Sequence, residues 1–373
     1  MPNPFTVAYL ISALDKSGPV NILYGIIRHL ECDRENLIII TLKEIPEEKS
    51  REQDFLDLGV RVIHAKLSTF NLLSGYRKLK KIFRDNQVTI IHSHCLRSCI
   101  YNALFSGKYT SIHTAHSDPF REYRFLLPFP FSWFFICLLL LSLRFLTCVV
   151  GCASYIEKEL SSYIRQSHLS HITNGIDVSF FKPAADSERN DLISQLDWAP
   201  GKIHLIASSR ITRQKNFSFL LKALQDFGDR IHLIVLGNGD QFDLFKQYNQ
   251  KGTIEFRGFC EDVRPYLQSA DYFISASRLE GFSCSVLEAM ACGTPVILSS
   301  IPSHSILKET EESQFSSAFF SLDDTAGLST IFERIINGSL SLNRESARNL
   351  VCTHYTAQKM SRSYLELYDR YSR

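Results

Sequence analysis

The stretch Glu280-Gly-Phe-Ser-Cys-Ser-Val-Leu-Glu288-Ala-Met-Ala-Cys-Gly-Thr-Pro-Val-Ile297 indicates the fold of this chain of 373 residues. It follows an apolar run that ends near Ser275, and it has the order of a loop, a helix, a glycine stop and a buried strand. Gly293 and Pro295 are predicted to end the helix, because glycine tolerates the left-handed conformation and proline cannot continue a helix. A strand, a helix and a second strand in succession are typical of a parallel sheet covered by helices.

The start of the predicted helix has the features of a phosphate site. Ser283 is placed to cap a helix whose first turn offers unpaired backbone N–H groups and the positive end of a dipole. Gly281 lets this backbone approach a ligand closely. Glu288 lies roughly 7.5 Å along the helix from Ser283, a distance that suits the diol of a ribose. Glu280 precedes the helix and would face the group attached beyond the phosphates, so the stretch predicts a nucleotide-sugar site.

Short apolar strands alternate with helical patterns on the N-terminal side of this stretch. The expected strands of the first part are residues 7–11, 37–42, 60–63, 88–92, 111–116 and 146–151. The polar segment 182–198 interrupts the alternation, which resumes with strands at 203–208, 231–236, 253–256, 272–275 and 295–298. Because 373 residues exceed the usual size of one hydrophobic core, we predict an α/β protein with two doubly wound, Rossmann-like domains. Ligands of such sheets bind beyond the carboxyl ends of the strands.

Three further loops after predicted strands carry polar groups. Arg210 and Lys215 follow the strand 203–208, and both side chains suit the oxygens of a diphosphate. Gly18 follows the first strand and could bring a backbone N–H against a phosphate. His113 and His116 lie at the end of the strand 111–116. We expect one of the two histidines to point at substrate.

The composition excludes several classes of function. The 41 basic and 39 acidic residues give a net charge of +2, so nucleic-acid binding is not expected. The ten cysteines lack the paired spacing of a zinc site and are expected to be reduced. His92 and His94 have no third ligand nearby, and no Asp-x-Asp pair occurs, so no metal site is predicted. Nothing at the N-terminus resembles a signal peptide, which makes the cytoplasm the expected compartment.

One segment departs from the pattern of a soluble domain. Residues 125–143 contain no charged side chain, although Pro128 and Pro130 shorten the helical part to residues 131–143. Three interpretations remain open for this helix: insertion into a membrane surface, burial in the protein, or a true membrane span. Residues 76–84 form a basic amphipathic pattern, which fits either contact with an anionic membrane or a solvated helix face.

Nearly the whole chain resembles the family 4 retaining glycosyltransferases of the GT-B fold, and the motif formed by Glu280 and Glu288 is the most specific match. Supporting matches are Arg210 with Lys215-Asn216, the turn 236–240, Phe256-Arg-Gly258, Asn174-Gly-Ile-Asp177 and the closing helix 361–371. In this family the last helix crosses back to the first domain. The resemblance therefore implies an acceptor-side domain of residues 1–182 completed by about 356–373, and a nucleotide-sugar domain of residues 183–355.

The resemblance also implies a role for each matching residue. Glu288 would hold the ribose hydroxyls, Arg210 and Lys215 the diphosphate, and Glu280 the donor sugar. His116 would bind the donor sugar near the anomeric carbon, and Gly18 the distal phosphate. The backbone of Phe256, Arg257 and Gly258 would meet the base. The remaining donor-binding positions are Gly281, Phe282, Ser283, Cys284, Ser285 and Val286.

The expected function is transfer of a sugar from a UDP- or GDP-sugar to a glycan or lipid-linked acceptor in bacterial surface-polysaccharide synthesis. The family retains the anomeric configuration without a metal or another cofactor. The expected location is the cytoplasm, with contact to the inner face of the plasma membrane as an open alternative. Two alternatives remain for the function: another GT-B enzyme, such as a sugar phosphorylase or a nucleotide-sugar epimerase, or an inactive donor-binding module. Pro19 and Cys284 depart from the family pattern, where glycine is frequent.

Overall fold

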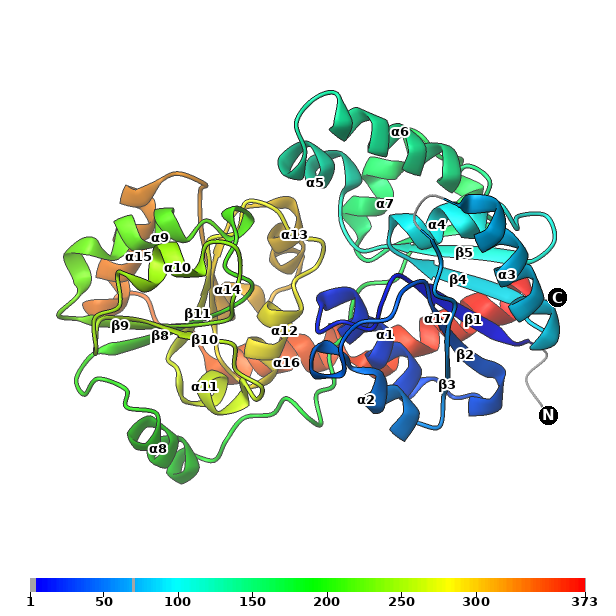
Figure 1. The fold of residues 1–373 in the computed structure, drawn as a ribbon. Coiled ribbons are helices and arrows are strands. Elements are labelled where there is room, and N and C mark those ends of the chain that lie inside the picture. The colour runs from blue at the N-terminus through cyan, green and yellow to red at the C-terminus, as the bar shows by residue number, and fades with distance from the viewer. Residues whose placement is uncertain (1–4, 69–70, 373) are drawn as a thin grey trace. The chain divides into compact units, whose positions relative to one another are not determined.

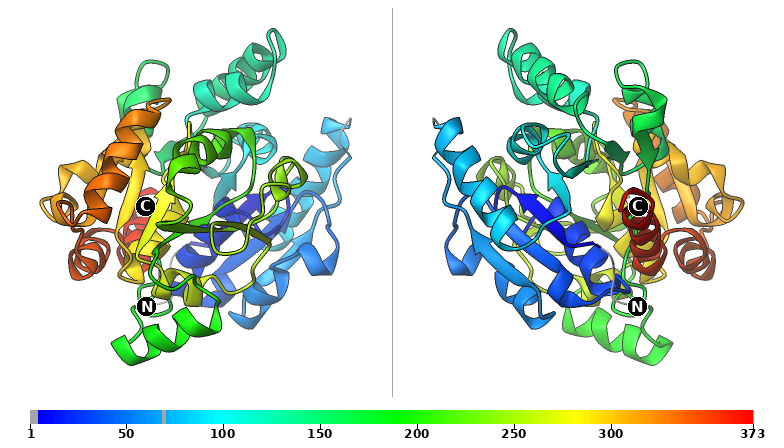
Figure 2. Two further views of the ribbon diagram at one scale, coloured as in Figure 1. Left: turned by 90° about the vertical axis from the view of Figure 1, so that its left-hand side faces the viewer. Right: turned by 90° about the vertical axis from the view of Figure 1, so that its right-hand side faces the viewer.

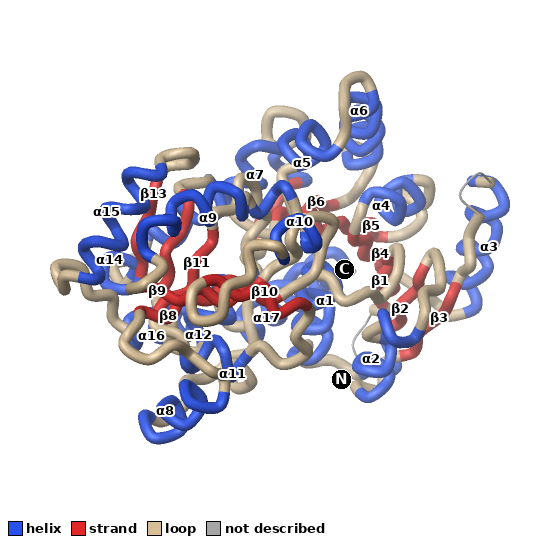
Figure 3. Tube along the Cα trace, turned by 60° about the vertical axis from the view of Figure 1, so that its left-hand side comes forward, coloured by secondary structure: helices blue, strands red, loops and turns tan. Residues whose placement is uncertain are grey.

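The computed structural model describes residues 5–68 and 71–372, which form two compact units. Unit 1 comprises Met1–Gly175 and Ala357–Arg373, and unit 2 comprises Ile176–Thr356. Each unit contains one parallel sheet covered by helices (Figure 1), as the tube in Figure 3 also shows with strands in red and helices in blue. The prediction of two doubly wound α/β domains is confirmed.

The sheet of unit 1 has seven parallel strands in the order β3-β2-β1-β4-β5-β6-β7. Their bounds are β1 Val7–Ile11, β2 Leu37–Thr41, β3 Arg61–His64, β4 Ile90–His94, β5 Thr110–Ala115, β6 Cys148–Gly151 and β7 Leu169–His171. Strands β1, β2 and β4 are buried along their whole length, because helices cover both faces of the sheet, and β1 and β2 are almost entirely apolar. The edge strand β7 was not predicted, since it is only three residues long.

The helices of unit 1 begin at residues that suit a first turn. Pro19 lies in the first turn of α1, where a missing N–H leaves no intrahelical bond unmade. Asp118 caps α5 and accepts hydrogen bonds from the N–H groups of Phe120 and Arg121. The bounds are α1 Gly18–His29, α2 Glu52–Asp57, α3 Leu72–Asp85, α4 Leu96–Ala103, α5 Pro119–Leu126, α6 Phe131–Leu143, α7 Ser154–Leu160 and α17 Ala357–Tyr371.

The C-terminal helix α17 packs against α1 and against the sheet of unit 1. The hydroxyl of Tyr368 lies 2.7 Å from Nδ1 of His92, and Nε2 of His92 lies 2.8 Å from Oγ1 of Thr114. The hydroxyl of Tyr364 lies 2.9 Å from the same threonine oxygen. All four side chains are fully buried, so these hydrogen bonds satisfy polar groups that would otherwise be costly to bury. The last helix of the chain therefore completes unit 1.

The sheet of unit 2 has six parallel strands in the order β10-β9-β8-β11-β12-β13. The strands are β8 Ile203–Ser208, β9 Ile231–Leu236, β10 Ile254–Gly258, β11 Tyr272–Ser275, β12 Val296–Ser299 and β13 Ser317–Phe320. The helices are α8 Asp186–Gln195, α9 Phe217–Leu224, α10 Phe242–Lys246, α11 Arg264–Ser269, α12 Cys284–Ala291, α13 Pro302–Ser305, α14 Ser313–Ser316, α15 Thr325–Ile336 and α16 Arg344–His354. A 3-10 turn, η4, covers Arg213–Lys215.

The order of strands reverses once in each sheet. In unit 2 the chain runs outward from β8 through β9 to β10, and it then restarts at β11 on the other side of β8. In unit 1 the corresponding reversal lies between β1 and β4. Loops that leave neighbouring strands in opposite directions open a crevice at the carboxyl ends of those strands. The reversal between β8 and β11 is therefore the place in unit 2 where a ligand site is expected.

Helix α6 is neither fully buried nor long. One side packs on the unit through Ser132, Ile136, Leu139 and Leu143, which are buried, while Phe131 and Phe134 are 61% and 62% exposed. Its neighbours in the fold are α4 and α5, and Figure 2 shows it in blue-green, projecting away from the sheet of unit 1. The interpretation of α6 as a buried helix is therefore correct for the side that packs on the unit and wrong for the side that carries Phe131 and Phe134. Of the helices within residues 5–68 and 71–372, none combines the length and the apolar character that crossing a bilayer requires.

Buried neutral histidines make the stability of the protein dependent on pH. Burial lowers the pKa of His113 to about 3 and that of His232 to about 4, from an ordinary 6.5. Because the folded pKa is the lower one, the unfolded chain binds protons first as the pH falls below 6.5. Each such histidine contributes stability that is fully present above pH 6.5, and about 1.4 kcal/mol of it is lost for each further pH unit until the folded pKa is reached.

We therefore expect the urea midpoint to fall steeply between pH 6.5 and pH 4.5. Trp198 is buried in unit 2 and its ring lies 5.2 Å from that of His232, so its fluorescence in a Trp133→Phe variant reports unfolding of this unit. A midpoint that stayed constant from pH 7.5 to pH 4.5 would contradict the expectation.

Candidate functional site

A small pocket lies at the strand reversal of unit 2. Its free volume is about 10 Å³, roughly the space of one water molecule. The walls come from the ends of β8 and β11 and from the first turn of α12, and the polar part of the lining is Ser208, Ser209, Lys215, Ser275, Ser277 and Ser285. The pocket is therefore lined by one cation and a group of hydroxyls, a set that suits an anionic or sugar ligand.

The loop that carries Arg210 is held by the glycine-rich turn 236–240. Two backbone hydrogen bonds, of 3.0 and 2.9 Å, join this turn to the loop 209–211. A Cβ on Gly237 or Gly239 would lie closer than 3.0 Å to backbone atoms of that loop, so only glycine allows the approach. The side chain of Arg210 is exposed at the end of β8. The turn thus fixes the path of the loop and leaves the guanidinium accessible.

Lys215 and Glu280 form an ion pair beside the pocket. Lys215 ends the turn η4, and its Nζ lies 2.5 Å from Oε1 of Glu280. The hydroxyl of Ser277 donates a second hydrogen bond to the same oxygen, at 2.6 Å. The side chains of the pair are only 16% and 11% exposed. The structure therefore brings together two residues that the sequence assigned to different parts of a donor, and they bind each other.

The carboxyl of Glu280 is ionised in this setting. Burial raises its pKa, but the charge of Lys215 and the hydrogen bonds from Lys215 and Ser277 outweigh burial and lower the pKa below its ordinary value. An ionised carboxylate only accepts hydrogen bonds. Glu280 can consequently hold hydroxyl groups of a ligand, but it carries no proton to donate at neutral pH.

Ser277, the hydrogen-bond donor to Glu280, is itself linked by hydrogen bonds to Ser299 and His304. The Ser299 hydroxyl donates to the carbonyl of Ser277 at 2.6 Å, and Nδ1 of His304 lies 2.9 Å from the carbonyl of Ser299. Since a carbonyl only accepts, His304 carries its proton on Nδ1. Sequence reasoning missed Ser277, Ser299 and His304, because single serines and a histidine in loops carry no spacing signal. Their position at or after the carboxyl ends of β11 and β12 is the pattern that could have indicated them.

The first turn of α12 contributes Ser285 to the lining of the pocket. Ser283 is the N-cap residue as predicted, but its hydroxyl lies 3.2 Å from that of Ser285 and makes no hydrogen bond to the backbone of the helix. The prediction that its side chain caps the helix is therefore wrong, because the neighbouring hydroxyl is the closer partner. Phe282 is buried against the ring of Tyr355, at 5.1 Å between centroids. Glu288 lies in the second turn and is half-buried.

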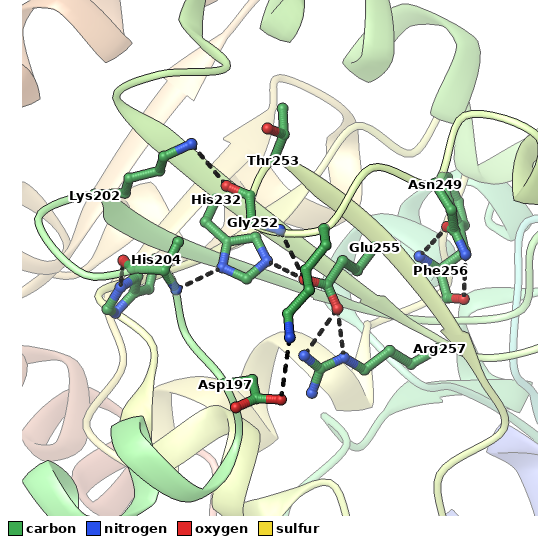
Figure 4. Close-up of polar contacts among 12 residues, drawn as sticks. Asp197, Lys202, His204, His232, Asn249, Gly252, Thr253, Glu255, Phe256 and Arg257 are labelled. Atoms are coloured by element: carbon green, nitrogen blue, oxygen red, sulfur yellow. Dashed lines mark hydrogen bonds and ion pairs between the residues drawn. The ribbon is translucent and has the colours of Figure 1, made fainter.

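Phe256, Arg257 and Gly258, whose backbone was predicted to meet the base, form hydrogen bonds within the protein (Figure 4). Phe256 is buried, and its N–H donates to Oδ1 of Asn249 at 2.6 Å. The guanidinium of Arg257 binds Oε2 of Glu255 at 2.9 Å. The carbonyl of Gly258 accepts from the N–H of Gly237 at 2.7 Å. These hydrogen bonds hold β10 at the edge of the sheet.

The two candidates in unit 1 lie at the carboxyl ends of its strands. His116 directly follows β5, and its Nε2 lies 2.9 Å from Nδ1 of His94. Burial lowers the pKa of His116 to about 4, so the imidazole is neutral at pH 7. Gly18 is the first residue of α1, and a Cβ there would meet no atom within 4 Å. Space alone therefore does not require glycine at this position.

Comparisons with known proteins identify the family. A model described as Glycosyltransferase Family 4 matches residues 17–180, and one described as Glycosyl transferases group 1 matches residues 202–336. The chain is 31% identical over 199 residues to alpha-monoglucosyldiacylglycerol synthase of Streptococcus pneumoniae, a match that covers 50% of this chain and 44% of that relative. This match spans less than half of that protein's length.

A relative that matches over more of the chain, and a solved structure, are also similar to this protein. The chain is 24% identical over 340 residues to UDP-Gal:alpha-D-GlcNAc-diphosphoundecaprenol alpha-1,3-galactosyltransferase of Escherichia coli, covering 84% of this chain and 85% of the relative. The crystal structure of Anabaena Alr3699/HepE in complex with UDP-glucose superimposes with a TM-score of 0.83 at 16% identity, over 98% of this chain and all of that one. The shared fold is the GT-B fold. The chain therefore belongs to the family 4, group 1 type glycosyltransferases, and it is a transferase.

Proposed function

We propose that the protein is a retaining, metal-independent glycosyltransferase that moves a sugar from a UDP-sugar or GDP-sugar to a glycan or lipid-linked acceptor in bacterial surface-polysaccharide synthesis. The observation that carries the proposal is the buried pair of Lys215 and Glu280, which lies beside a hydroxyl-lined pocket at the strand reversal of unit 2. An ammonium group next to an ionised carboxylate offers hydrogen-bond donors to phosphate and acceptors to sugar hydroxyls within one site.

Lys215 and Glu280 bind different parts of the donor. Lys215 has three N–H donors and uses one of them on Glu280, so further donors can reach oxygens of a diphosphate. Glu280 accepts from hydroxyls of the donor sugar. The first-turn N–H groups of α12 add the positive end of the helix dipole, and Glu288 accepts from the ribose hydroxyls. His116 binds the donor sugar through a neutral imidazole.

Departure of the nucleotide builds negative charge on the diphosphate. Arg210, Lys215 and the start of α12 stabilise that charge without a metal ion. The absence of an Asp-x-Asp pair from the sequence supports this part of the proposal. Attack by the acceptor on the face that the nucleotide leaves, with a phosphate oxygen taking the proton, retains the anomeric configuration. Neither glutamate acts as a nucleophile, in contrast to the paired carboxyls of retaining glycosidases.

The names of similar proteins support the class of donor and acceptor. The Anabaena structure was solved with UDP-glucose, and the name of the Escherichia coli relative contains UDP-Gal and a diphosphoundecaprenol acceptor. We therefore propose a uridine donor as the first choice and an acceptor on a lipid diphosphate. A cytoplasmic location at the inner face of the plasma membrane follows from such an acceptor.

A screen of nucleotide-sugars tests the proposal. We expect nucleotide release from one UDP- or GDP-sugar that depends on the acceptor and continues in excess EDTA, and we expect NMR of the product to show the anomer of the donor. Loss of activity in EDTA that Mg²⁺ or Mn²⁺ restores would contradict the metal-free part. A requirement for inorganic phosphate would indicate a phosphorylase, product formation without acceptor an epimerase, and binding without turnover an inactive module.

Helices α3 and α6 support contact with an anionic membrane. Five basic side chains of α3 are exposed: Arg77, Lys78, Lys80, Lys81 and Arg84. The exposed side of α6 and its flanks carries Leu126, Phe129, Phe131, Phe134, Leu141 and Phe145. Both helices pack near α4, since Gly75 of α3 contacts Tyr101 and α6 contacts α4. Aromatic insertion beside basic side chains is the usual combination for binding at a lipid surface.

Vesicle sedimentation tests this contact. We expect the protein to bind vesicles that contain phosphatidylglycerol, with binding weakened at least about tenfold by Phe131→Ser with Phe134→Ser, because two large apolar side chains no longer enter the interface. Leu56→Ser is the matched control, since Leu56 is exposed on α2, away from α6. Equal binding of all variants, or no binding by the unchanged protein, would contradict the membrane contact.

A further inference from the structure

His94 ends strand β4 of unit 1 and contacts the candidate substrate-binding residue His116. Its side chain is fully buried, and its Nδ1 lies 2.9 Å from Nε2 of His116. The two rings lie 5.1 Å apart with only 28° between their planes, and the ring of His92 packs against His94 at 4.4 Å. The second ring nitrogen of His94, Nε2, is buried without a hydrogen-bond partner among the described residues.

The contact restricts the protonation states of both rings. A hydrogen bond between two ring nitrogens needs one N–H and one lone pair, so at most one of the two facing nitrogens carries a proton. Burial lowers the pKa of both histidines, which keeps both rings neutral at pH 7. In either tautomer Nε2 of His116 is engaged by His94. Within the described part of the chain no hydrogen bond involves Nδ1 of His116, and the residue is half-buried, so this nitrogen faces outward.

We propose that His94 is a positioning residue, which occupies Nε2 of His116 and leaves Nδ1 as the nitrogen that meets the sugar of the donor. The role of His116 toward the donor rests on the proposed function, whereas the pairing of the two rings does not. The bond to His94 orients the imidazole, because rotation of the His116 ring would break it and leave a buried nitrogen of His94 without its partner.

The histidines next to the pair are neutral, and the acidic residues that follow His116 have partners of their own. His92 on β4 and His113 on β5 are the titratable groups whose charge would act on the pair, and burial lowers the pKa of both. Asp118 and Glu122 follow on α5, where Asp118 pairs with Arg121 and Glu122 accepts from Ser117. A neutral His116 binds a sugar hydroxyl through one hydrogen bond at Nδ1, and it does not act as a cationic acid.

Two substitutions of His94 give a matched test. An asparagine side chain places a hydrogen-bonding atom where Nδ1 of the histidine lies, whereas a leucine side chain has almost the same shape and no polar atom. We expect His94→Leu to lower kcat at least about tenfold with less than about a threefold change in KM for the donor, because His116 is present but no longer oriented. We expect His94→Asn to recover most of kcat. Equal kcat in His94→Leu and the unchanged enzyme would overturn the proposal.

NMR of ¹⁵N-labelled histidine separates this inference from the proposed function. We expect a through-hydrogen-bond coupling between Nδ1 of His94 and Nε2 of His116, and no protonation of His116 between pH 5.5 and pH 8. The coupling is lost in His94→Leu and unaffected in His113→Asn, a control at another buried histidine, whose Nδ1 lies 3.0 Å from the hydroxyl of Ser93. Absence of the coupling, or a His116 pKa near 6.5, would overturn the pairing whether or not the protein transfers sugar.

Discussion

Replacement of Lys215 by methionine is expected to lower kcat/KM for the donor by more than about a hundredfold. The ammonium group supplies a cation where the diphosphate gains charge, and methionine supplies none. The same change removes the partner of Glu280, whose side chain is only 11% exposed. An unpaired buried carboxylate costs about 3 kcal/mol, so unfolding of unit 2 should begin at a markedly lower urea concentration.

A second substitution separates the loss of activity from the loss of stability. In the double variant Lys215→Met with Glu280→Gln neither side chain of the pair carries a charge, and most of the lost stability should return while activity stays low. Arg213→Met is the matched control, because it removes an exposed cation from the same turn and should leave the free energy of unfolding within about 0.5 kcal/mol of the parent value. If Lys215→Met were as stable as the parent protein, or if the double variant regained activity, the assigned role of the pair would be wrong.

Gly237→Ala is expected to destabilise unit 2 by about 2 to 3 kcal/mol and to lower kcat/KM at least about tenfold. Gly237 has a φ of 127°, a conformation that residues with a side chain rarely adopt. A Cβ there would also meet the carbonyl group of Ser209, so the loop that carries Arg210 must move. Stability and donor affinity should therefore fall together, although the glycine itself contacts no ligand.

Asp240→Ala is the control for that prediction. Asp240 belongs to the same turn and its side chain is exposed, so its removal should change the urea midpoint little. Urea unfolding and steady-state kinetics on both variants give the comparison. A Gly237→Ala protein with the stability and kinetics of the parent would show that the turn does not hold the Arg210 loop.

Much of the fold was readable from local patterns. The runs 203–208 and 231–236 coincide with β8 and β9, because a strand buried on both faces is a continuous apolar segment. Gly293 has a φ of 78° and follows Cys292, the C-cap residue of α12, so it ends the helix as its place in the motif predicted. β7 and β13 were missed, since three or four residues are too few to show a period.

The sequence predicted which residues belong to the candidate site, but it did not predict how they contact one another. Arg210, Lys215 and Glu280 were named from motifs, but the ion pair joins residues 65 positions apart, and each had been given a different part of the donor. His94 was considered only as a metal ligand, whereas the structure makes it the partner of His116. The hydrogen bond of Phe256 with Asn249 had no signal in the sequence, because a bond between a side chain and a backbone group seven residues away follows no helix or strand period.

Hydrophobic periodicity and the glycine and proline stops were enough to predict two parallel sheets and the strand ends that carry the polar loops, whereas the family was indicated by the resemblance of the motifs. These features are local, since each depends on the conformation of a few consecutive residues. The partners of the polar side chains depended on the tertiary structure. The reversal of strand order places the loop after β8 beside the loop after β11, and that neighbourhood alone puts Lys215 against Glu280, which keeps the Glu280 carboxyl ionised.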